Sequence, residues 1–291
     1  MTSILMNCYN CKRYLKEAID SVYAQTVSDW EVIFIDNCST DGSKEILEDY
    51  DEKIKYYKTE KNVSLGEARN FGLLFCKSEY LAFLDTDDAW LPEKLETELE
   101  LMDKNQNFQM CYSSFFFINE NSIETTKYSV FAESGNIFKH LLKRYEINMQ
   151  TVLLRNNFNI SFNPQMEFSP DYDLFMEIAS KKEIGVISAP LVKYRKTSSS
   201  LTSKKVSRWW LEMKMTLDRI LKNFTELQNS DEVRFAYAKV FYYKAIYLIK
   251  EKKTKEAREY LKRIRFLDSK YFSLYILSFS PYLWNLVHKL K

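Results

Sequence analysis

Short apolar runs alternate with segments of helical period along the first two hundred residues. The apolar runs at 3–7, 31–36 and 79–84 predict buried strands, because they are short and rich in aliphatic and aromatic side chains. The segments at 12–25 and 62–78 carry apolar residues at helical spacing and predict helices. This alternation is typical of βαβ units, so we expect an α/β fold with a mixed, mostly parallel sheet flanked by helices.

The alternation continues until a polar stretch at 196–205, KTSSSLTSKK, after which the sequence keeps a helical period to its end. We therefore predict two domains, an α/β domain at 1–205 and a helical C-terminal extension at 206–291. Within the first domain, further helices are expected at 39–50, 91–105, 136–145 and 170–182, and further strands at 54–59, 108–119, 149–155 and 184–196.

Composition and charge exclude several classes of protein. Lys and Arg number 42 and Asp and Glu 40, so the net charge of +2 gives no overall field for nucleic acid, and we expect no nucleic-acid partner. The five glycines form neither a GxGxxG fingerprint nor a P-loop. His140 and His288 are the only histidines, so a general base is expected among the carboxylates. The odd number of cysteines and a first segment without a secretion signal favour a reducing cytoplasm.

Acidic residues stand at the ends of two predicted strands. Asp36 ends one strand, and Asp85, Asp87 and Asp88 follow another. In an open α/β sheet, ligands bind beyond the carboxyl ends of the strands, so these side chains are candidates for a binding site. Three carboxylates within four residues repel one another, and a divalent cation is the simplest partner for them. Such oxygen ligands suit Mg²⁺ or Mn²⁺, which keep positions open for substrate phosphates.

Three ordered segments carry a family resemblance: 3–43 (SILMNCYNCKRYLKEAIDSVYAQTVSDWEVIFIDNCSTDGS), 62–72 (NVSLGEARNFG) and 78–95 (SEYLAFLDTDDAWLPEKL). Together they resemble the N-terminal half of the family 2 inverting glycosyltransferases, which have the Rossmann-like GT-A fold. The resemblance implies a hexosyltransferase that uses a nucleotide-diphosphate sugar, a divalent metal (Mn²⁺ or Mg²⁺) and a single displacement. The family's commonest role, the synthesis of bacterial surface polysaccharide, implies a glycan or lipid-linked acceptor.

The resemblance assigns the nucleotide-binding residues one by one. Asp36 matches the aspartate that accepts a hydrogen bond from the uracil N3–H, so the implied donor is a UDP-sugar. Arg69 matches a basic residue beside the base and diphosphate, with a surface arginine of the helix as the alternative. Tyr9 and Asn10 match the family's first motif, and we expect this first strand to reach the nucleotide.

Asp85, Thr86 and Asp87 match the DxD motif of the family, and the adjacent Asp88 is also common there. The resemblance implies that Asp87 binds the metal, with Asp88 as a second candidate ligand. The resemblance also implies that the neighbouring carboxylates bind the ribose or metal-bound water. The division of these roles among the three aspartates stays open at this point.

The family's catalytic base falls in an acidic pair that opens a helix. The matching segment is FSPDYDLFMEIA, which puts Asp171 at the base position, replaces the customary Glu by Pro170, and leaves Asp173 as the reserve candidate. A carboxylate in the first turn that only stabilises the helix dipole is the alternative for both aspartates. A later family motif appears with Arg195 retained and Thr197 where a histidine is common, and Arg195 is expected to offset diphosphate charge.

Three other interpretations compete with a glycosyltransferase. Cys8 and Cys11 form a CxxC between a strand and a helix, the context of a redox motif, although we expect two buried or half-buried thiols. A phosphohydrolase of the haloacid-dehalogenase type would use Asp85 as its nucleophile. A non-catalytic helical adaptor would depend on the C-terminal third and leave the first domain inactive.

An aromatic, uncharged segment lies at 271–287, close to the C-terminus. It is short for a membrane span and contains Pro281, so we expect it not to cross a bilayer. Its Tyr and Trp residues and the flanking lysines suit a membrane surface, and packing on the catalytic domain or on the second subunit of a homodimer is the alternative. We therefore expect a cytoplasmic protein, with peripheral contact to the inner face of the membrane as one option.

Overall fold

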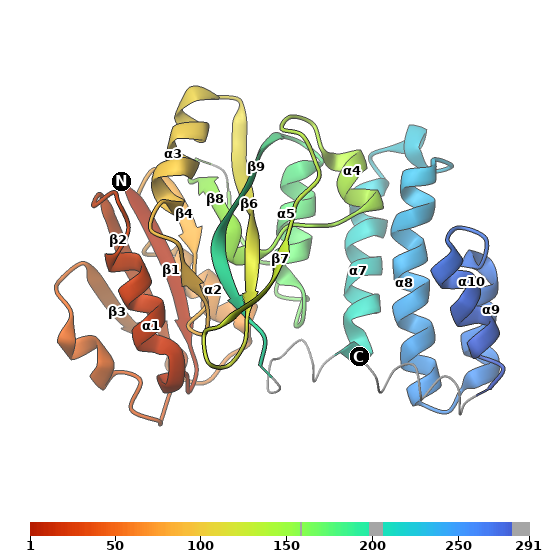
Figure 1. Cartoon of the computed structure of the whole chain (residues 1–291), viewed down its shortest axis with the longest axis horizontal. Coiled ribbons are helices and arrows are strands. Elements are labelled where there is room, and N and C mark those ends of the chain that lie inside the picture. Colours follow the sequence, from red (N-terminus) through yellow and green to blue (C-terminus); the bar gives the residue numbers. More distant parts are fainter. Residues whose placement is uncertain (158, 198–205, 281–291) are drawn as a thin grey trace. The chain divides into compact units, whose positions relative to one another are not determined.

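In the computed structural model, which describes residues 1–157, 159–197 and 206–280, one mixed sheet forms the centre of the first of two units (Figure 1). This unit comprises Met1–Phe138 and Glu146–Ser198, and the second takes Lys139–Tyr145 and the chain beyond residue 198. Within the described part of the chain, the strand order is β3-β2-β1-β4-β8-β6-β9-β5, with β7 beside β6. The strands are β1 (Thr2–Cys8), β2 (Trp30–Asp36), β3 (Ile54–Lys58), β4 (Tyr80–Phe83), β5 (Ala89–Trp90), β6 (Phe108–Ile118), β7 (Glu124–Tyr128), β8 (Val152–Arg155) and β9 (Glu183–Arg195).

The N-terminal half of the sheet is parallel, as the βαβ pattern predicts. Strand β1 pairs in parallel with β2 and β4, and β2 pairs in parallel with β3. Strand β8 runs antiparallel to both β4 and β6, while β9 is parallel to β6. The helices of this unit are α1 (Lys12–Tyr23), α2 (Leu65–Leu73), α3 (Lys94–Lys104) and α5 (Pro170–Ala179), with short 3₁₀ turns η1 (Glu45–Asp49) and η2 (Met149–Thr151).

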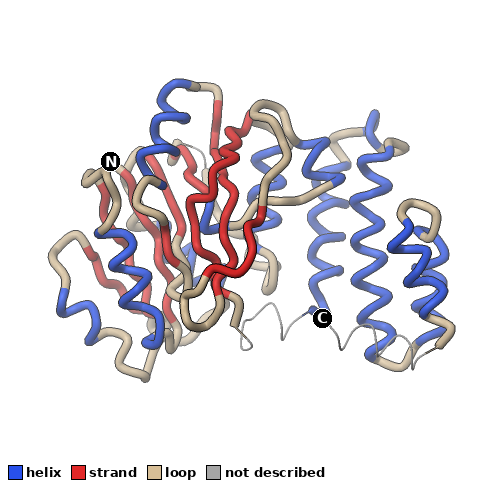
Figure 2. The backbone as a smooth tube through the Cα atoms, in the orientation of Figure 1, coloured by secondary structure: helices blue, strands red, loops and turns tan. Residues whose placement is uncertain are grey.

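Helices cover both faces of this sheet, as the ribbon and the tube show (Figure 2). The alternation of side chains along a strand sends Ile4 to the face that packs on α1, where Ile19 and Leu15 are fully buried. Leu5 points to the opposite face and meets α2 at Gly72, where a Cβ would lie 2.4 Å from the Leu5 side chain. A glycine is therefore required at this helix–sheet contact, because any larger residue would push the helix from the sheet.

Several elements differ from those that the sequence predicts. The expected helix at 39–50 is reduced to η1, because the Asp41 side chain accepts hydrogen bonds from the backbone N–H groups of Lys12 and Ser43 and holds this segment as a loop. The short strands β5 and β7 were not expected. Neither carries a sequence signal of its own, since β5 has two residues and β7 is a polar edge strand.

The second unit is helical in its described part, as expected for the C-terminal region. Its core contains Ala238, Ala245, Leu261 and Leu274. Among the described helices, none is long and apolar enough to cross a lipid bilayer. Pro281 and the rest of the expected aromatic segment beyond residue 280 lie outside the described residues. The helices here are α4 (Phe138–Lys143, whose first residue belongs to the first unit), α7 (Val206–Leu221), α8 (Asp231–Lys250), α9 (Thr254–Ile264) and α10 (Ser269–Leu277), with the turn η3 (Thr225–Leu227).

Candidate active site

The carboxyl ends of β1, β2 and β4 bring the predicted nucleotide-binding residues to one edge of the sheet. Cys8 and Asp36, the last residues of β1 and β2, are partners in the parallel register. Leu5 pairs with Phe83 at the end of β4, so Asp85 emerges at the same edge two residues later. The sequence predicts this convergence correctly, because parallel strands end on the same side.

Asp36 is 3% exposed and is fixed by two neighbours. One carboxylate oxygen accepts from the Ser39 N–H at 2.7 Å and the other from the Tyr56 hydroxyl at 2.7 Å. Burial and this bond to Asp36 raise the pKa of Tyr56 above its ordinary value, so Tyr56 stays a proton donor. The carboxylate is thus held in one orientation, and each oxygen keeps a lone pair for a ligand donor.

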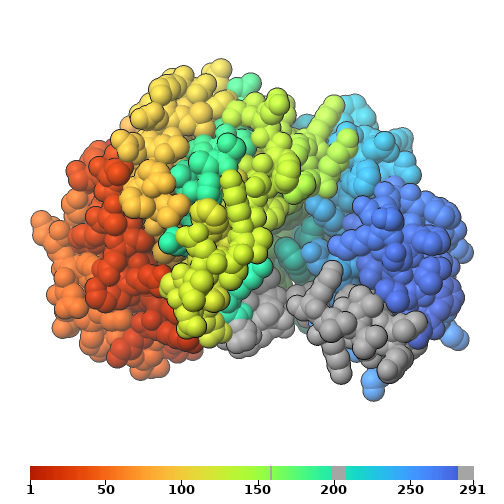
Figure 3. Space-filling model, in the orientation of Figure 1, coloured from red at the N-terminus to blue at the C-terminus, as the bar shows by residue number. Residues whose placement is uncertain are grey.

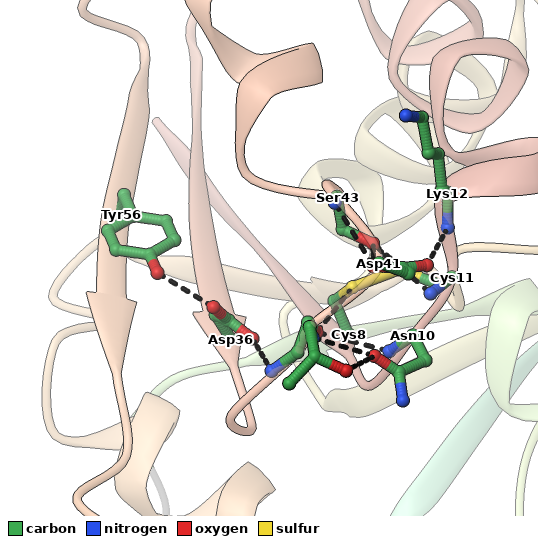
Figure 4. Close-up of a disulfide and its surroundings, with 10 residues drawn as sticks. Cys8, Asn10, Cys11, Lys12, Asp36, Asp41, Ser43 and Tyr56 are labelled. Carbon is green, nitrogen blue, oxygen red and sulfur yellow. Dashed lines mark hydrogen bonds between the residues drawn. A yellow bond between two sulfur atoms is a disulfide. The ribbon is translucent and has the colours of Figure 1, made fainter.

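The loop between β1 and α1 carries Tyr9 and Asn10, of which Figure 4 shows Asn10. Asn10 has a positive φ of 54°, which turns the chain sharply after the strand. Its Oδ1 accepts from the Thr40 N–H at 2.8 Å, and its own N–H donates to Ser39 Oγ at 3.1 Å. Tyr9 is 57% exposed, so its ring is available to a ligand at this edge of the sheet.

Cys8 and Cys11 form a disulfide across this loop, so the expectation of two free thiols is wrong (Figure 4). The turn at Asn10 brings the two Cα atoms to 5.8 Å, a separation that a disulfide spans readily. The spacing of a CxxC at a strand–helix junction is compatible with a disulfide, but it does not distinguish a bonded pair from two thiols.

Asp85, whose side chain is 37% exposed, is held from two sides. Arg69, whose side chain is 6% exposed, donates from NH2 to Asp85 Oδ1 at 3.1 Å. Gln150 donates from Nε2 to Asp85 Oδ2 at 2.6 Å and accepts from the Asp85 N–H at 2.7 Å. Arg69 is therefore not a surface arginine, and it places a buried positive charge beside the triplet.

Thr86, Asp87 and the adjacent Asp88 differ in their surroundings. Asp87 is partly exposed, and burial together with the charge of Asp85 raises its pKa to about 6. Thr86 and Asp88 are buried. One Asp88 oxygen accepts from the backbone N–H of Arg195 at 2.7 Å, and burial raises the pKa of Asp88 well above its ordinary value. Asp87 and Asp85 are thus the triplet carboxylates nearest to solvent, while Asp88 belongs to the turn behind them.

Arg195, which is expected to offset diphosphate charge, is directed to acceptors of the protein in this structure. Its side chain is fully buried, and its Nε donates to the Asp87 carbonyl oxygen at 2.7 Å. Its other nitrogens donate to the Asn119 carbonyl oxygen, to Ser122 Oγ and to Glu17 Oε2, the last at 2.6 Å. With its donors satisfied by protein acceptors, Arg195 fixes the backbone of the DxD turn rather than reaching across the site.

Asp171 lies near the nucleotide edge, where α2 and α5 begin. Gly66 of α2 is adjacent to Pro170, the first residue of α5. Burial raises the pKa of Asp171, Arg69 opposes this rise, and Asp85 adds to it, so the three charges lie within electrostatic reach. Asp171 itself is partly exposed and can meet a substrate.

Asp173, the reserve candidate for the base, points elsewhere. It is 5% exposed, and its carboxylate accepts from Asn163 Nδ2 at 3.4 Å. The loop before α5 is itself anchored to α2, because Asn70 exchanges two hydrogen bonds with the backbone of Phe162. This packing gives Asp171 a defined position and directs Asp173 into the protein.

The acidic residues of the site fit a metal ion only if a ligand completes its coordination. Within the described ranges, no group of three or more His, Cys, Asp or Glu residues is arranged to hold a cation. Asp87 supplies a carboxylate whose pKa is raised by burial and by the neighbouring negative charge of Asp85, so a cation beside it would be stabilising. Mg²⁺ in nucleotide sites commonly takes one or two carboxylates and completes its shell with phosphate oxygens. The donor set therefore fits a cation shared between protein and diphosphate.

Sequence reasoning missed the residues that position the site from a distance. Gln150 lies in η2 between an asparagine cap and β8, and no periodic pattern marks it. Glu17 lies on α1 and accepts a hydrogen bond from Arg195, which is 178 positions away in the sequence. Tyr56 could have been suspected from the parallel register of β2 and β3, which places it beside Phe34, two residues before Asp36.

The fold and the site define the class of the protein. Over 95% of the chain, the fold matches 81% of the crystal structure of S. aureus TarS 1–349 in complex with UDP-GlcNAc, with a TM-score of 0.70 and 19% sequence identity. Likeness at this identity establishes the fold, and the chain has the GT-A fold of glycosyltransferases, as expected.

Sequence comparison then gives the family. The sequence model described as Glycosyl transferase family 2 matches residues 3–175, and the chain belongs to this family. It is 32% identical over 216 residues to the Escherichia coli UDP-Glc:alpha-D-GlcNAc-diphosphoundecaprenol beta-1,3-glucosyltransferase WfgD, which covers 72% of this chain and 84% of that protein. It is 28% identical over 210 residues to the putative teichuronic acid biosynthesis glycosyltransferase TuaG of Bacillus subtilis, covering 70% and 82%. The protein is a glycosyltransferase, and the phosphohydrolase interpretation of Asp85 is excluded.

Proposed function

We propose that this glycosyltransferase moves a hexosyl group, with inversion, from a UDP-sugar to a hydroxyl of a glycan or lipid-linked acceptor in bacterial surface polysaccharide synthesis. The observation that carries the proposal is the convergence of Asp36, Arg69, Asp85 and Asp171 at one edge of the sheet. The relative WfgD, whose name states UDP-Glc and a diphosphoundecaprenol acceptor, supports the donor and acceptor classes. Such lipid-linked intermediates support a cytoplasmic site of action.

The nucleotide half of the site suits uridine. The Asp36 carboxylate is oriented by Ser39 and Tyr56 and accepts the N3–H of uracil in this proposal. The exposed ring of Tyr9 provides a flat apolar surface beside it. Cytosine lacks the N3–H donor and would place the lone pair of its N3 against the Asp36 carboxylate, which disfavours it.

In this proposal, the diphosphate half of the site combines the positive charge of an arginine with that of a metal ion taken up from solution. Arg69 supplies a fixed positive charge beside Asp85. Asp87, with Asp85 adjacent, would hold Mn²⁺ or Mg²⁺, and the ion, when bound, would offset the negative charge that develops on the departing UDP. Asp88 is not assigned to the metal here, because it is enclosed behind the turn.

Asp171 acts as the base in this proposal. The acceptor hydroxyl attacks the anomeric carbon, its proton passes to the Asp171 carboxylate, and the bond from the anomeric carbon to the UDP oxygen breaks with its electron pair on UDP. Arg69 holds the Asp171 pKa down against the effect of burial, which keeps the base ionised. Asp173 is less suited, because it is buried against Asn163.

The decisive experiment measures UDP binding by titration calorimetry with and without Mn²⁺, and UDP release from a panel of nucleotide sugars. Asp87→Asn should lose the metal-dependent gain in UDP affinity while remaining folded. Asp49→Asn, which removes an exposed carboxylate of η1 in the same unit, is the matched control and should keep the gain.

Two outcomes would overturn the proposal. If UDP fails to bind in the presence of Mn²⁺ or Mg²⁺, the assignment of a UDP-sugar as the donor is wrong. If Asp87→Asn binds UDP with the same metal dependence as the native protein, the assignment of the metal to Asp87 is wrong.

A further inference from the structure

Positive charge is concentrated in one stretch of the helical unit. Between Lys250 and Lys270 the sequence has nine Lys and Arg residues against four acidic residues, whereas the whole chain has a net charge of only +2. This stretch contains α9 and leads into α10. A nearly neutral protein therefore carries a strongly basic region where the described part of the chain ends.

The basic residues surround a hollow rather than a flat surface. A cavity of about 450 Å³ lies at the start of α9, and its charged lining consists of Lys252, Lys253, Lys255 and Arg258 together with one carboxylate, Glu256, while Phe279 is its aromatic residue. Four basic side chains against the single carboxylate of Glu256 leave the hollow with a net positive charge, which favours an anionic occupant. Phe279 gives the hollow an apolar wall.

An exposed apolar stripe runs along α10 beside this hollow. Phe272, Ile276 and Phe279 follow the i, i+4, i+7 spacing of one helix face and are 47%, 52% and 57% exposed. The Phe279 N–H donates to the Ile276 carbonyl, which continues the turn past the helix end. Leu274 points to the opposite side and is buried. The helix is thus apolar both toward its own core and toward solvent.

Two arginines lie over exposed phenylalanine rings next to the basic hollow. The Arg258 guanidinium lies 4.7 Å from the centre of the Phe279 ring, and that of Arg265 lies 4.5 Å from the centre of the Phe266 ring. Phe266 is 80% exposed and stacks near Phe272. Aromatic rings with cations on their faces suit the boundary between lipid head groups and acyl chains. In Figure 3 these segments form the dark-blue part of the surface.

We propose that this α9–α10 surface, made of Lys252, Lys253, Lys255, Arg258, Phe266, Phe272, Ile276 and Phe279, docks on the surface of an anionic phospholipid bilayer. Charge complementarity selects this occupant, because anionic head groups would offset the excess positive charge of the hollow while the phenylalanines enter the interface. A second copy of the chain is disfavoured as the occupant, since the basic hollows of the two copies would face each other and repel. The inference rests on the proposed function only for its purpose, which is to concentrate the enzyme where a lipid-linked acceptor lies.

The test is flotation of the full chain with vesicles of phosphatidylcholine alone and of phosphatidylcholine and phosphatidylglycerol in equal parts. The native protein should float only with the anionic vesicles. The triple variant Lys252→Gln/Lys253→Gln/Lys255→Gln should partition roughly a hundredfold less, since each lysine near an anionic surface contributes about fivefold. The triple variant Phe272→Gln/Ile276→Gln/Phe279→Gln should also lose binding, and neither should unfold, because these side chains are solvent-exposed or line an open hollow.

One control removes the same number of lysines elsewhere, and a second removes an exposed apolar side chain elsewhere. Lys77→Gln/Lys104→Gln/Lys182→Gln removes three exposed lysines of the first unit, and Leu74→Gln removes an apolar side chain that is 62% exposed. Both controls should float like the native protein. Equal loss in controls and test variants would show a nonspecific charge effect and overturn the proposal.

Two further results would also overturn it. Native protein that stays unbound with anionic vesicles excludes membrane docking. A concentration-dependent dimer that Phe272→Gln/Ile276→Gln/Phe279→Gln abolishes, without flotation of the native protein, would assign the surface to self-association. UDP binding is measured in parallel on each variant and should not change, so failure of docking and failure of the proposed transferase chemistry are distinguishable.

Discussion

Gln150 holds Asp85 at both its backbone and its side chain. The Gln150 Oε1 accepts from the Asp85 N–H at 2.7 Å, and its Nε2 donates to Asp85 Oδ2 at 2.6 Å. This pair leaves the other carboxylate oxygen, Oδ1, turned to Arg69. The orientation of the first DxD carboxylate is therefore fixed by a residue that is 65 positions away in the sequence.

Gln150→Ala should weaken donor binding without unfolding the domain. It removes two hydrogen bonds, one of them to a charged group, and bonds of that kind contribute about 1.5 to 3 kcal/mol, so kcat/KM should fall roughly ten- to a hundredfold. Steady-state kinetics and UDP titration with Mn²⁺ measure the effect. Gln150→Glu should be at least as harmful, because a second carboxylate would repel Asp85.

Gln109→Ala is the matched control for this prediction. Gln109 is also a buried glutamine of the sheet, but its amide donates to the Arg155 carbonyl oxygen and to Asn157 away from the triplet. It should lower the melting temperature and leave UDP affinity unchanged. Equal UDP affinity in Gln150→Ala and Gln109→Ala would show that Gln150 has only a structural role.

The acid limb of the pH profile should report Asp171. A base must be ionised, and burial raises the Asp171 pKa, so kcat/KM should fall as pH decreases through a value above the ordinary aspartate range. Arg69→Met removes the charge that opposes this rise and should move the acid limb to higher pH. Lys104→Gln, which removes an exposed charge at the end of α3, should leave the limb in place.

Substitution of Asp171 should separate activity from stability. Asp171→Asn should reduce turnover by roughly a hundredfold or more and barely change UDP affinity. Because the folded-state pKa lies above the ordinary aspartate value of 3.8, the contribution of this group to stability is present below pH 3.8 and is lost as pH rises through the folded pKa. Asp171→Asn should therefore raise the melting temperature at neutral pH. Full activity in Asp171→Asn with loss in Asp173→Asn would move the base to Asp173.

Arg195→Met should destabilise the domain rather than only weaken a ligand contact. The guanidinium is buried and bonds to the Asp87 carbonyl oxygen and to Glu17, and removal of one partner of a buried ion pair commonly costs about 3 to 5 kcal/mol. Because Glu17 is partly exposed, we expect the lower end of this range. Urea unfolding measures the free energy. An unchanged free energy of unfolding together with a large loss of UDP affinity would instead show that Arg195 contacts the diphosphate.

The sequence is sufficient to predict the parts of the site that follow from strand direction. Asp36 and Asp85 each come directly after a short apolar run, and parallel pairing alone brings them to one edge. The packing of Arg195 and Gln150 could not be predicted in this way. Both act through partners that are distant in sequence, because Arg195 ends β9 beside Ile118 of β6 and Gln150 lies in the turn η2 before β8, and neither position leaves a periodic signal.

The Cys8–Cys11 disulfide should contribute to stability and little to nucleotide binding. Independent hydrogen bonds hold the loop, from Thr40 N–H to Asn10 Oδ1, from Asn10 N–H to Ser39 Oγ and from Lys12 N–H to Asp41. The double variant Cys8→Ser/Cys11→Ser should keep UDP affinity within about threefold, since none of these bonds uses sulfur.

Asn10→Ala is the matched comparison, because it removes the side-chain hydrogen bond to the Thr40 backbone and retains the disulfide. Asn10→Ala should lower UDP affinity roughly tenfold, since Asn10 Oδ1 bonds the Thr40 backbone and the positive φ of Asn10 suits few other residues. The disulfide closes a loop of only a few residues, and in the chain-entropy account this contributes about 2 kcal/mol, so the Cys variant and the reduced protein should melt at lower temperature. If reduction alone lowers UDP affinity tenfold, the bond between Cys8 and Cys11 positions the loop, and the hydrogen bonds of Asn10 do not suffice.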